Sequence, residues 1–148
     1  MPTQLTVKNL PQGFQSIISN GRHSILADEP ISSRGTDLGF SPPELVLAGL
    51  AMCKAATVRF IARREGWADR LRDVDAKATQ RVRRDRETGR LRTEVSFELQ
   101  IEGELTPTER AHLVQEADAC YIHRMLQGDW ELSPATLLPV APLPNAAE

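Results

Sequence analysis

The sequence predicts a fold that mixes short antiparallel strands with two apolar helices. Three observations support this prediction: helix start signals at Ser41, a long alternating hairpin between Val74 and Ile101, and a second helix start at Thr106. Helices and strands that are apolar on one face must pack that face against another element. A chain of 148 residues has the usual size of one domain. We therefore expect a single domain over residues 1–148, with a frayed tail at 139–148.

The N-terminal part of the chain is expected to form strands. Segments 4–10 and 14–19 are short and partly apolar, and segment 23–27 continues in an extended pattern. Asn20 and Gly21 form a hairpin turn signal between the last two segments. A loop rich in Gly, Ser and Asp follows at residues 28–40.

The first helix has clear signals at both ends. Ser41 is a suitable N-cap, Pro42 fits the first helical position, and Glu44 completes a capping box with Ser41. Gly66 is the expected stop. The predicted apolar stripe runs through Leu47, Leu50, Ala51, Val58 and Ile61.

The middle of the chain predicts a hairpin whose two strands each have one wet face. Apolar and polar residues alternate through 74–83 and again through 91–102. Basic residues cluster in and just before the link at 85–89, and they are Arg81, Arg83, Arg84 and Arg86. Because Asp85, Glu87 and Glu94 lie among them, we interpret this cluster as a solvated hairpin tip rather than a phosphate site.

The second helix begins at a capping box formed by Thr106 and Glu109, with Pro107 at its first position. Its pattern continues to Cys120, and a further short helix is expected around 121–126. A final strand is expected after Trp130.

Composition excludes some classes of function. The net charge of −2 offers no bulk attraction to nucleic acid or to an anionic membrane. The longest apolar run, 45–53, stops at Lys54 and is too short to cross a bilayer. No secretion signal opens the chain, so we expect a cytoplasmic protein whose two cysteines are kept reduced.

Cys53 and Cys120 are the candidate reactive residues. Apolar surroundings favour an inert, neutral thiol, and the middle of a helix offers no dipole. Lys54 is expected to point away from Cys53, so activation of Cys53 requires a cation from another segment. Two readings stay open at this point: a pair of buried small residues, or a redox couple. Two cysteines with scattered histidines make no metal-ligand spacing.

Three segments resemble a known family. Residues 37–53 (DLGFSPPELVLAGLAMC) are similar to the signature of the OsmC-like proteins, which include the organic hydroperoxide resistance enzymes. Residues 25–30 (ILADEP) and 120–124 (CYIHR) resemble two further family segments in the right order. The resemblance implies an α+β fold with antiparallel sheets and two core helices, in an intertwined homodimer with each active site at the subunit interface.

The resemblance also implies thiol peroxidase chemistry on organic hydroperoxides, with Cys53 as the peroxidatic thiol and Cys120 as the resolving thiol. The family's activating Arg corresponds best to Arg22, with Arg34 as a rival. Glu44 stands one position after the slot of a catalytic Glu, which here is Pro43, so its capping role is favoured over catalysis. Tyr121 stands where the family usually has Pro, and these departures indicate the general OsmC-like branch.

The implied reaction has a simple chemical logic. A thiolate attacks the peroxide, a sulfenic acid forms, and the second thiol converts it to a disulfide that an external dithiol reduces. No cofactor or metal is required. An apolar pocket from Leu50, Phe60 and Met125 is expected to favour alkyl hydroperoxides. The alternative function is a non-catalytic dimeric protein that binds a small apolar ligand in the same pocket.

Overall fold

The computed structural model describes residues 2–137, and the predicted frayed tail at 139–148 lies outside them. Within these residues the fold is α+β, with a three-stranded and a two-stranded antiparallel sheet and three α-helices. The elements in chain order are β1 Thr6–Asn9, β2 Ser16–Ser19, β3 Ser24–Ala27, η1 Ile31–Ser33, α1 Pro42–Arg64, η2 Ala68–Arg70, β4 Leu71–Arg84, β5 Leu91–Gly103, α2 Pro107–Glu116, η3 Ala117–Ala119 and α3 Tyr121–Gln127.

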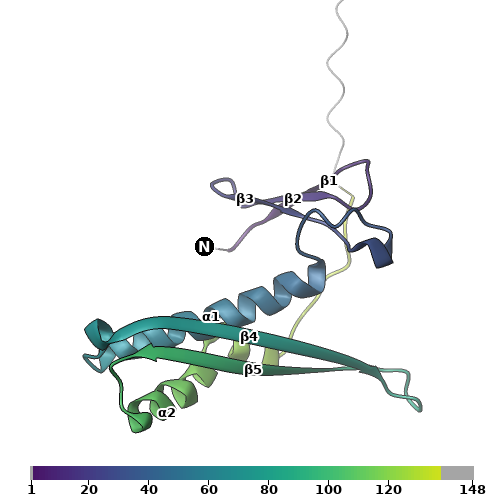
Figure 1. The fold of residues 1–148 in the computed structure, drawn as a ribbon. Helices are drawn as coiled ribbons and strands as arrows, with labels where there is room; N and C mark the ends of the chain where they lie inside the picture. The colour runs from purple at the N-terminus through teal and green to yellow at the C-terminus, as the bar shows by residue number, and fades with distance from the viewer. Residues whose placement is uncertain (1, 138–148) are drawn as a thin grey trace, which may run out of the picture.

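The N-terminal sheet has the strand order β1-β2-β3, with each neighbouring pair antiparallel. The predicted turn at Asn20 and Gly21 is confirmed. Asn20 Oδ1 accepts from the backbone N–H groups of Arg22 and His23, and Gly21 has a φ of 86°. Figure 1 shows this sheet set apart from the hairpin β4–β5, beyond the start of α1. Its contact with the rest of the described chain is slight.

Helix α1 begins and ends where the sequence predicts. Both the backbone N–H and the hydroxyl of Ser41 donate to Glu44 Oε2 at 2.8 Å, which forms the N-terminal cap. Gly66 follows the helix with a φ of 76°.

The expectation that the apolar run of this helix is too short to cross a bilayer needs correction. The helix continues well past Lys54, and its 23 residues are long and apolar enough to span a membrane by length and composition alone. Core helices of water-soluble proteins pass the same test. In this chain, α1 packs along β4 and against α2, η3 and α3.

The predicted hairpin is confirmed as β4 and β5, whose inward residues pair across the strands. Ala76 lies opposite Leu99, Ala78 opposite Phe97, and Val74 opposite Ile101. The tip is a surface turn in which Asp85 Oδ1 accepts from the N–H groups of Glu87 and Thr88, and the residues around it are exposed. The hairpin therefore has one face toward the helices and one toward solvent.

The C-terminal part differs from the sequence prediction in two ways. The α2 helix begins at the predicted capping box of Thr106 and Glu109, but Cys120 is not on its continuation. The chain turns through η3, and Cys120 becomes the extended N-cap of α3, with φ −61° and ψ 145°. The strand expected after Trp130 is wrong for the described residues up to 137, which form no strand there.

The core lies where the second half of α1 meets the base of the hairpin and α2. Its buried members are Val58, Ile61, Ala62, Leu71, Ile101, Leu105, Leu113 and Ala117. The first half of α1 is less covered, since Val46 and Met52 are 56% and 72% exposed.

Candidate functional site: two thiols beside a buried lysine

Two elements carry the two thiols. Cys53 lies in the middle of α1 and is partly buried, and its carbonyl accepts from the Thr57 hydroxyl at 2.8 Å. Cys120 caps α3 and is only 1% exposed, and its Sγ accepts from the His123 N–H at 3.3 Å. Both are free cysteines.

The fold brings these thiols together from distant segments. Burial raises the pKa of Cys120 above its usual range, and the hydrogen bond from the His123 N–H opposes that rise. The side chain of Cys53 is close enough to raise the pKa of Cys120 further, whereas the positive charge of Lys54 lowers it. One cluster is therefore formed by Cys53, Cys120, Lys54 and the first turn of α3, which carries His123.

Lys54 is the residue of this cluster that the sequence analysis missed. It is 1% exposed, and its Nζ lies 2.7 Å from Asp118 Oδ1, 3.1 Å from His123 Nδ1 and 4.6 Å from the centre of the Phe97 ring. The expectation that Lys54 points away from Cys53 stays a prediction, while its ammonium contacts residues on either side of Cys120. The missed signal was its spacing: Leu50, Lys54, Val58 and Ile61 form the buried stripe of α1.

Glu44 serves as the helix cap in this structure. Its carboxylate accepts from the backbone N–H and hydroxyl of Ser41, and these bonds hold its pKa below the usual range. A carboxylate held in this way is oriented toward Ser41 and stays ionised.

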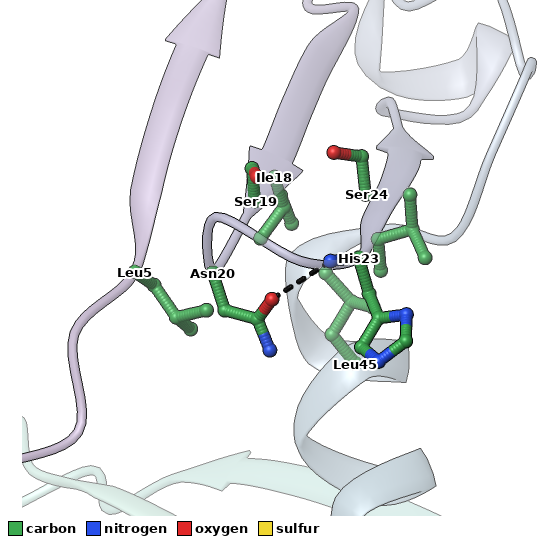
Figure 2. A pocket seen from close by; sticks show the side chains of 8 residues that line it. Leu5, Ile18, Ser19, Asn20, His23, Ser24 and Leu45 are labelled. Carbon is green, nitrogen blue, oxygen red and sulfur yellow. Dashed lines mark hydrogen bonds between the residues drawn. The ribbon is translucent and has the colours of Figure 1, made fainter.

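The two candidate activating arginines lie in exposed turns. Arg22 stands in the β2–β3 turn, and Arg34 follows η1 with a φ of 67°. Within residues 2–137, neither guanidinium makes a hydrogen bond or ion pair. Figure 2 shows the turn of Arg22, where Asn20 and His23 lie over Leu45 at a cavity of about 330 Å³. Leu45 precedes Cys53 by about two turns, or about 12 Å of helix.

A larger apolar cavity of about 550 Å³ opens between the start of α1, the hairpin and α3. Leu50, the first predicted pocket residue, lines it one turn before Cys53. Met125 and Phe60 are not among its lining residues and are 37% and 65% exposed. The lining residues are Pro42, Pro43, Val46, Leu47, Leu50, Gln80, Thr93, Val95 and Leu126.

Metal binding finds no support among the described residues. Over positions 2–137, no group of three or more His, Cys, Asp or Glu side chains is arranged to hold a metal ion.

Comparison with known proteins places the chain in a family. Residues 35–133 match the family model described as OsmC-like protein. The chain belongs to the OsmC-like family. This confirms the resemblance predicted from the sequence. A search of curated proteins finds no match.

Solved structures of OsmC-like proteins share the fold. An OsmC-like protein from Mycoplasma pneumoniae is 20% identical, with a TM-score of 0.72 over 86% of this chain and 89% of that chain. An organic hydroperoxide resistance protein from Legionella pneumophila is 21% identical, with a TM-score of 0.65 over 86% and 90%. The organic hydroperoxide resistance protein of Bacillus subtilis is 16% identical, with a TM-score of 0.64 over 87% and 93%. At these identities the likeness shows the fold.

Proposed function

We propose that this OsmC-like protein is a thiol peroxidase that reduces organic hydroperoxides. The observation that carries the proposal is the proximity of Cys53 and Cys120, two free thiols brought together by α1 and α3. The similarity in fold to two organic hydroperoxide resistance proteins adds support. The more accessible thiol, Cys53, is the proposed peroxidatic residue, and the buried Cys120 is the proposed resolving residue.

The proposed cycle has two oxidative steps. The Cys53 thiolate attacks one oxygen of the hydroperoxide, the O–O bond breaks, and an alkoxide leaves and takes up a proton to become the alcohol. Cys53 is then a sulfenic acid. The Cys120 sulfur attacks the Cys53 sulfur, the S–O bond breaks, and the hydroxide leaves as water with the proton of the Cys120 thiol.

An external dithiol completes the cycle by exchange with the disulfide. We expect the reaction to require no cofactor beyond this reductant. We expect the protein to work in the cytoplasm, because thiols are kept reduced there.

The apolar cavity of about 550 Å³ supports an organic substrate. Its walls are mostly aliphatic side chains and prolines, which gain free energy by covering an alkyl group but offer little to hydrogen peroxide. Leu50 joins this cavity to the turn of α1 that carries Cys53. We expect Phe60 and Met125 to contribute only where a second chain encloses them.

A second copy of the chain is the proposed cover for the open surfaces. Apolar side chains on the N-terminal sheet and on α1 remain uncovered, among them Val7, Ile25, Met52 and Phe60. An intertwined homodimer would bury such faces, and we expect it to bring the Arg22 turn near Cys53.

The same cavity supports one alternative, a dimeric protein that binds a small apolar ligand without catalysis. One titration separates the two functions. The reduced protein receives one equivalent of tert-butyl hydroperoxide, and its free thiols are counted over time. The peroxidase predicts rapid loss of both thiols in the wild-type protein and no loss in Cys53→Ser. Unchanged thiols in the wild-type protein support the binding protein instead.

A further inference from the structure

Lys54 is an unusual residue for its position. A lysine that is 1% exposed costs free energy unless its charge is compensated. Here Asp118 and His123 accept hydrogen bonds from its ammonium, and the face of the Phe97 ring lies 4.6 Å away. The fold therefore maintains a charged group inside the protein, directly next in sequence to the proposed peroxidatic residue.

The residues that contact the Lys54 ammonium lie on both sides of Cys120 in the sequence. Asp118 lies in η3 just before Cys120, and His123 lies in the first turn of α3 just after it. The backbone N–H of His123 donates to Cys120 Sγ while its ring accepts from Lys54. One residue of α1 thus holds both segments that flank the buried thiol.

We propose that Lys54 is a positioning residue for the resolving step, whose buried ammonium stabilises the negative charge that Cys120 acquires as it attacks the Cys53 sulfenic acid. This inference rests on the proposed peroxidase function. The need for such a charge follows from the burial of Cys120, which by itself favours the neutral, unreactive thiol. Asp118 limits the effect, because its carboxylate shares the same ammonium and is 75% exposed.

Among the described residues, Cys53, Lys54 and the backbone N–H of His123 act on the Cys120 thiol. Asp118 from η3, the His123 ring from α3 and the uncharged Phe97 ring from β5 contact the Lys54 ammonium. Asp118 and Lys54 carry opposite charges, so neutralising each of them is expected to move the titration of Cys120 in opposite directions.

The first test follows the ionisation of Cys120 and requires no peroxidase activity. With Cys53 replaced by Ser, alkylation of Cys120 by iodoacetamide is followed across pH. Lys54→Met is expected to raise the midpoint by about one pH unit or more, which is about a tenfold loss of thiolate at neutral pH. Lys54→Arg retains the positive charge and should keep the midpoint close to its value with Lys54. The matched control is Lys77→Met, an exposed lysine paired with Glu98 on the hairpin, which should leave the midpoint unchanged.

A second variant keeps the test valid if Lys54→Met fails to fold. Asp118→Asn removes an exposed carboxylate, leaves Lys54 in place and should lower the midpoint, because the ammonium loses its competing anion. An unchanged midpoint in a folded Lys54→Met, or a rise in Asp118→Asn, overturns the inference.

The reaction itself gives the third readout. In one turnover with both cysteines present, Lys54→Met should form the disulfide about tenfold more slowly than the wild-type protein. Equal rates of disulfide formation contradict the role of Lys54. A wild-type protein that consumes no hydroperoxide contradicts the peroxidase function. The Cys120 titration still decides, in that case, whether Lys54 acts on this thiol.

Discussion

Lys54 Nζ and Asp118 Oδ1 lie 2.7 Å apart, although the two residues are 64 positions apart in the chain. This ion pair joins the middle of α1 to the segment that leads into α3. The lysine end is buried and the aspartate end is exposed, so the charge on Lys54 is stabilised from the surface. The relationship explains how the helix of Cys53 fixes the position of Cys120.

Asp118→Asn is predicted to lower the stability of the protein. The variant weakens a hydrogen bond to a buried charge, and we expect a loss of about 1–2 kcal/mol, with the smaller value favoured by the exposure of Asp118. Urea unfolding measures it. The control is Asp75→Asn on the exposed face of β4, which should change the free energy of unfolding little. A loss no larger than that of the control would show that the ion pair contributes nothing.

The Asp28 carboxylate is predicted to stabilise the loop before α1 in a pH-dependent way. It is 2% exposed and accepts from the Thr36 hydroxyl at 2.6 Å and from the N–H groups of Glu29, Thr36 and Leu38. The Thr36 hydroxyl and these N–H groups, opposed by burial, lower its pKa from 3.8 to about 2. Because the folded pKa lies below the ordinary value, this stabilisation is present above about pH 4 and is lost as the pH falls toward 2.

Thermal unfolding across pH 2–5 checks this prediction. Other carboxylates with lowered pKa values, such as Glu109, also contribute to acid unfolding, so the comparison is between wild type and Asp28→Asn. The variant should be less stable at pH 6 and should lose less stability on acidification. Parallel pH profiles for the two proteins would rule out the assigned role of Asp28.

The homodimer is predicted to be obligate, with an interface above about 2,000 Å². Sedimentation velocity at low micromolar concentration should give the mass of two chains. Met52 is 72% exposed on α1, and Met52→Glu should weaken the dimer because it places a charge in the proposed interface. A wild-type monomer at this concentration would contradict the assembly.

The cation that activates Cys53 is predicted to be Arg22. With Cys120 replaced by Ser, the pH midpoint of Cys53 alkylation should rise by about one unit or more in Arg22→Met. Arg34→Met serves as the comparison, since Arg34 is also an exposed turn residue. A shift only in Arg34→Met transfers the role to Arg34, and no shift in either variant favours the binding protein.

Much of the fold could be predicted because its signals are local. The caps at Ser41 and Thr106, the turn at Asn20 and the alternation of the hairpin each depend on a few neighbouring residues. The resemblance of residues 37–53 to the OsmC-like signature predicted the rest of the architecture. The strand expected after Trp130 rested on weaker grounds, and residues 130–137 form no strand.

The site was predicted less completely because it depends on contacts between distant segments. Cys53 and Cys120 were identified, but the buried state of Lys54 was not, because a single lysine in an apolar run suggests a solvent-facing position. Its partners come from η3 and α3, and no local pattern specifies them. Cys120 was expected on a continuous helix, and the break at η3 makes it a cap instead.

The most direct test of the central claim is to map the product of a single oxidation. The reduced protein receives one equivalent of an organic hydroperoxide, is alkylated and digested, and its peptides are analysed by mass spectrometry. We predict a disulfide between Cys53 and Cys120 within one chain, and in Cys120→Ser a Cys53 sulfenic acid that over-oxidises with excess hydroperoxide. Both cysteines recovered as alkylated thiols, or Cys120 oxidised while Cys53 remains reduced, would contradict the account.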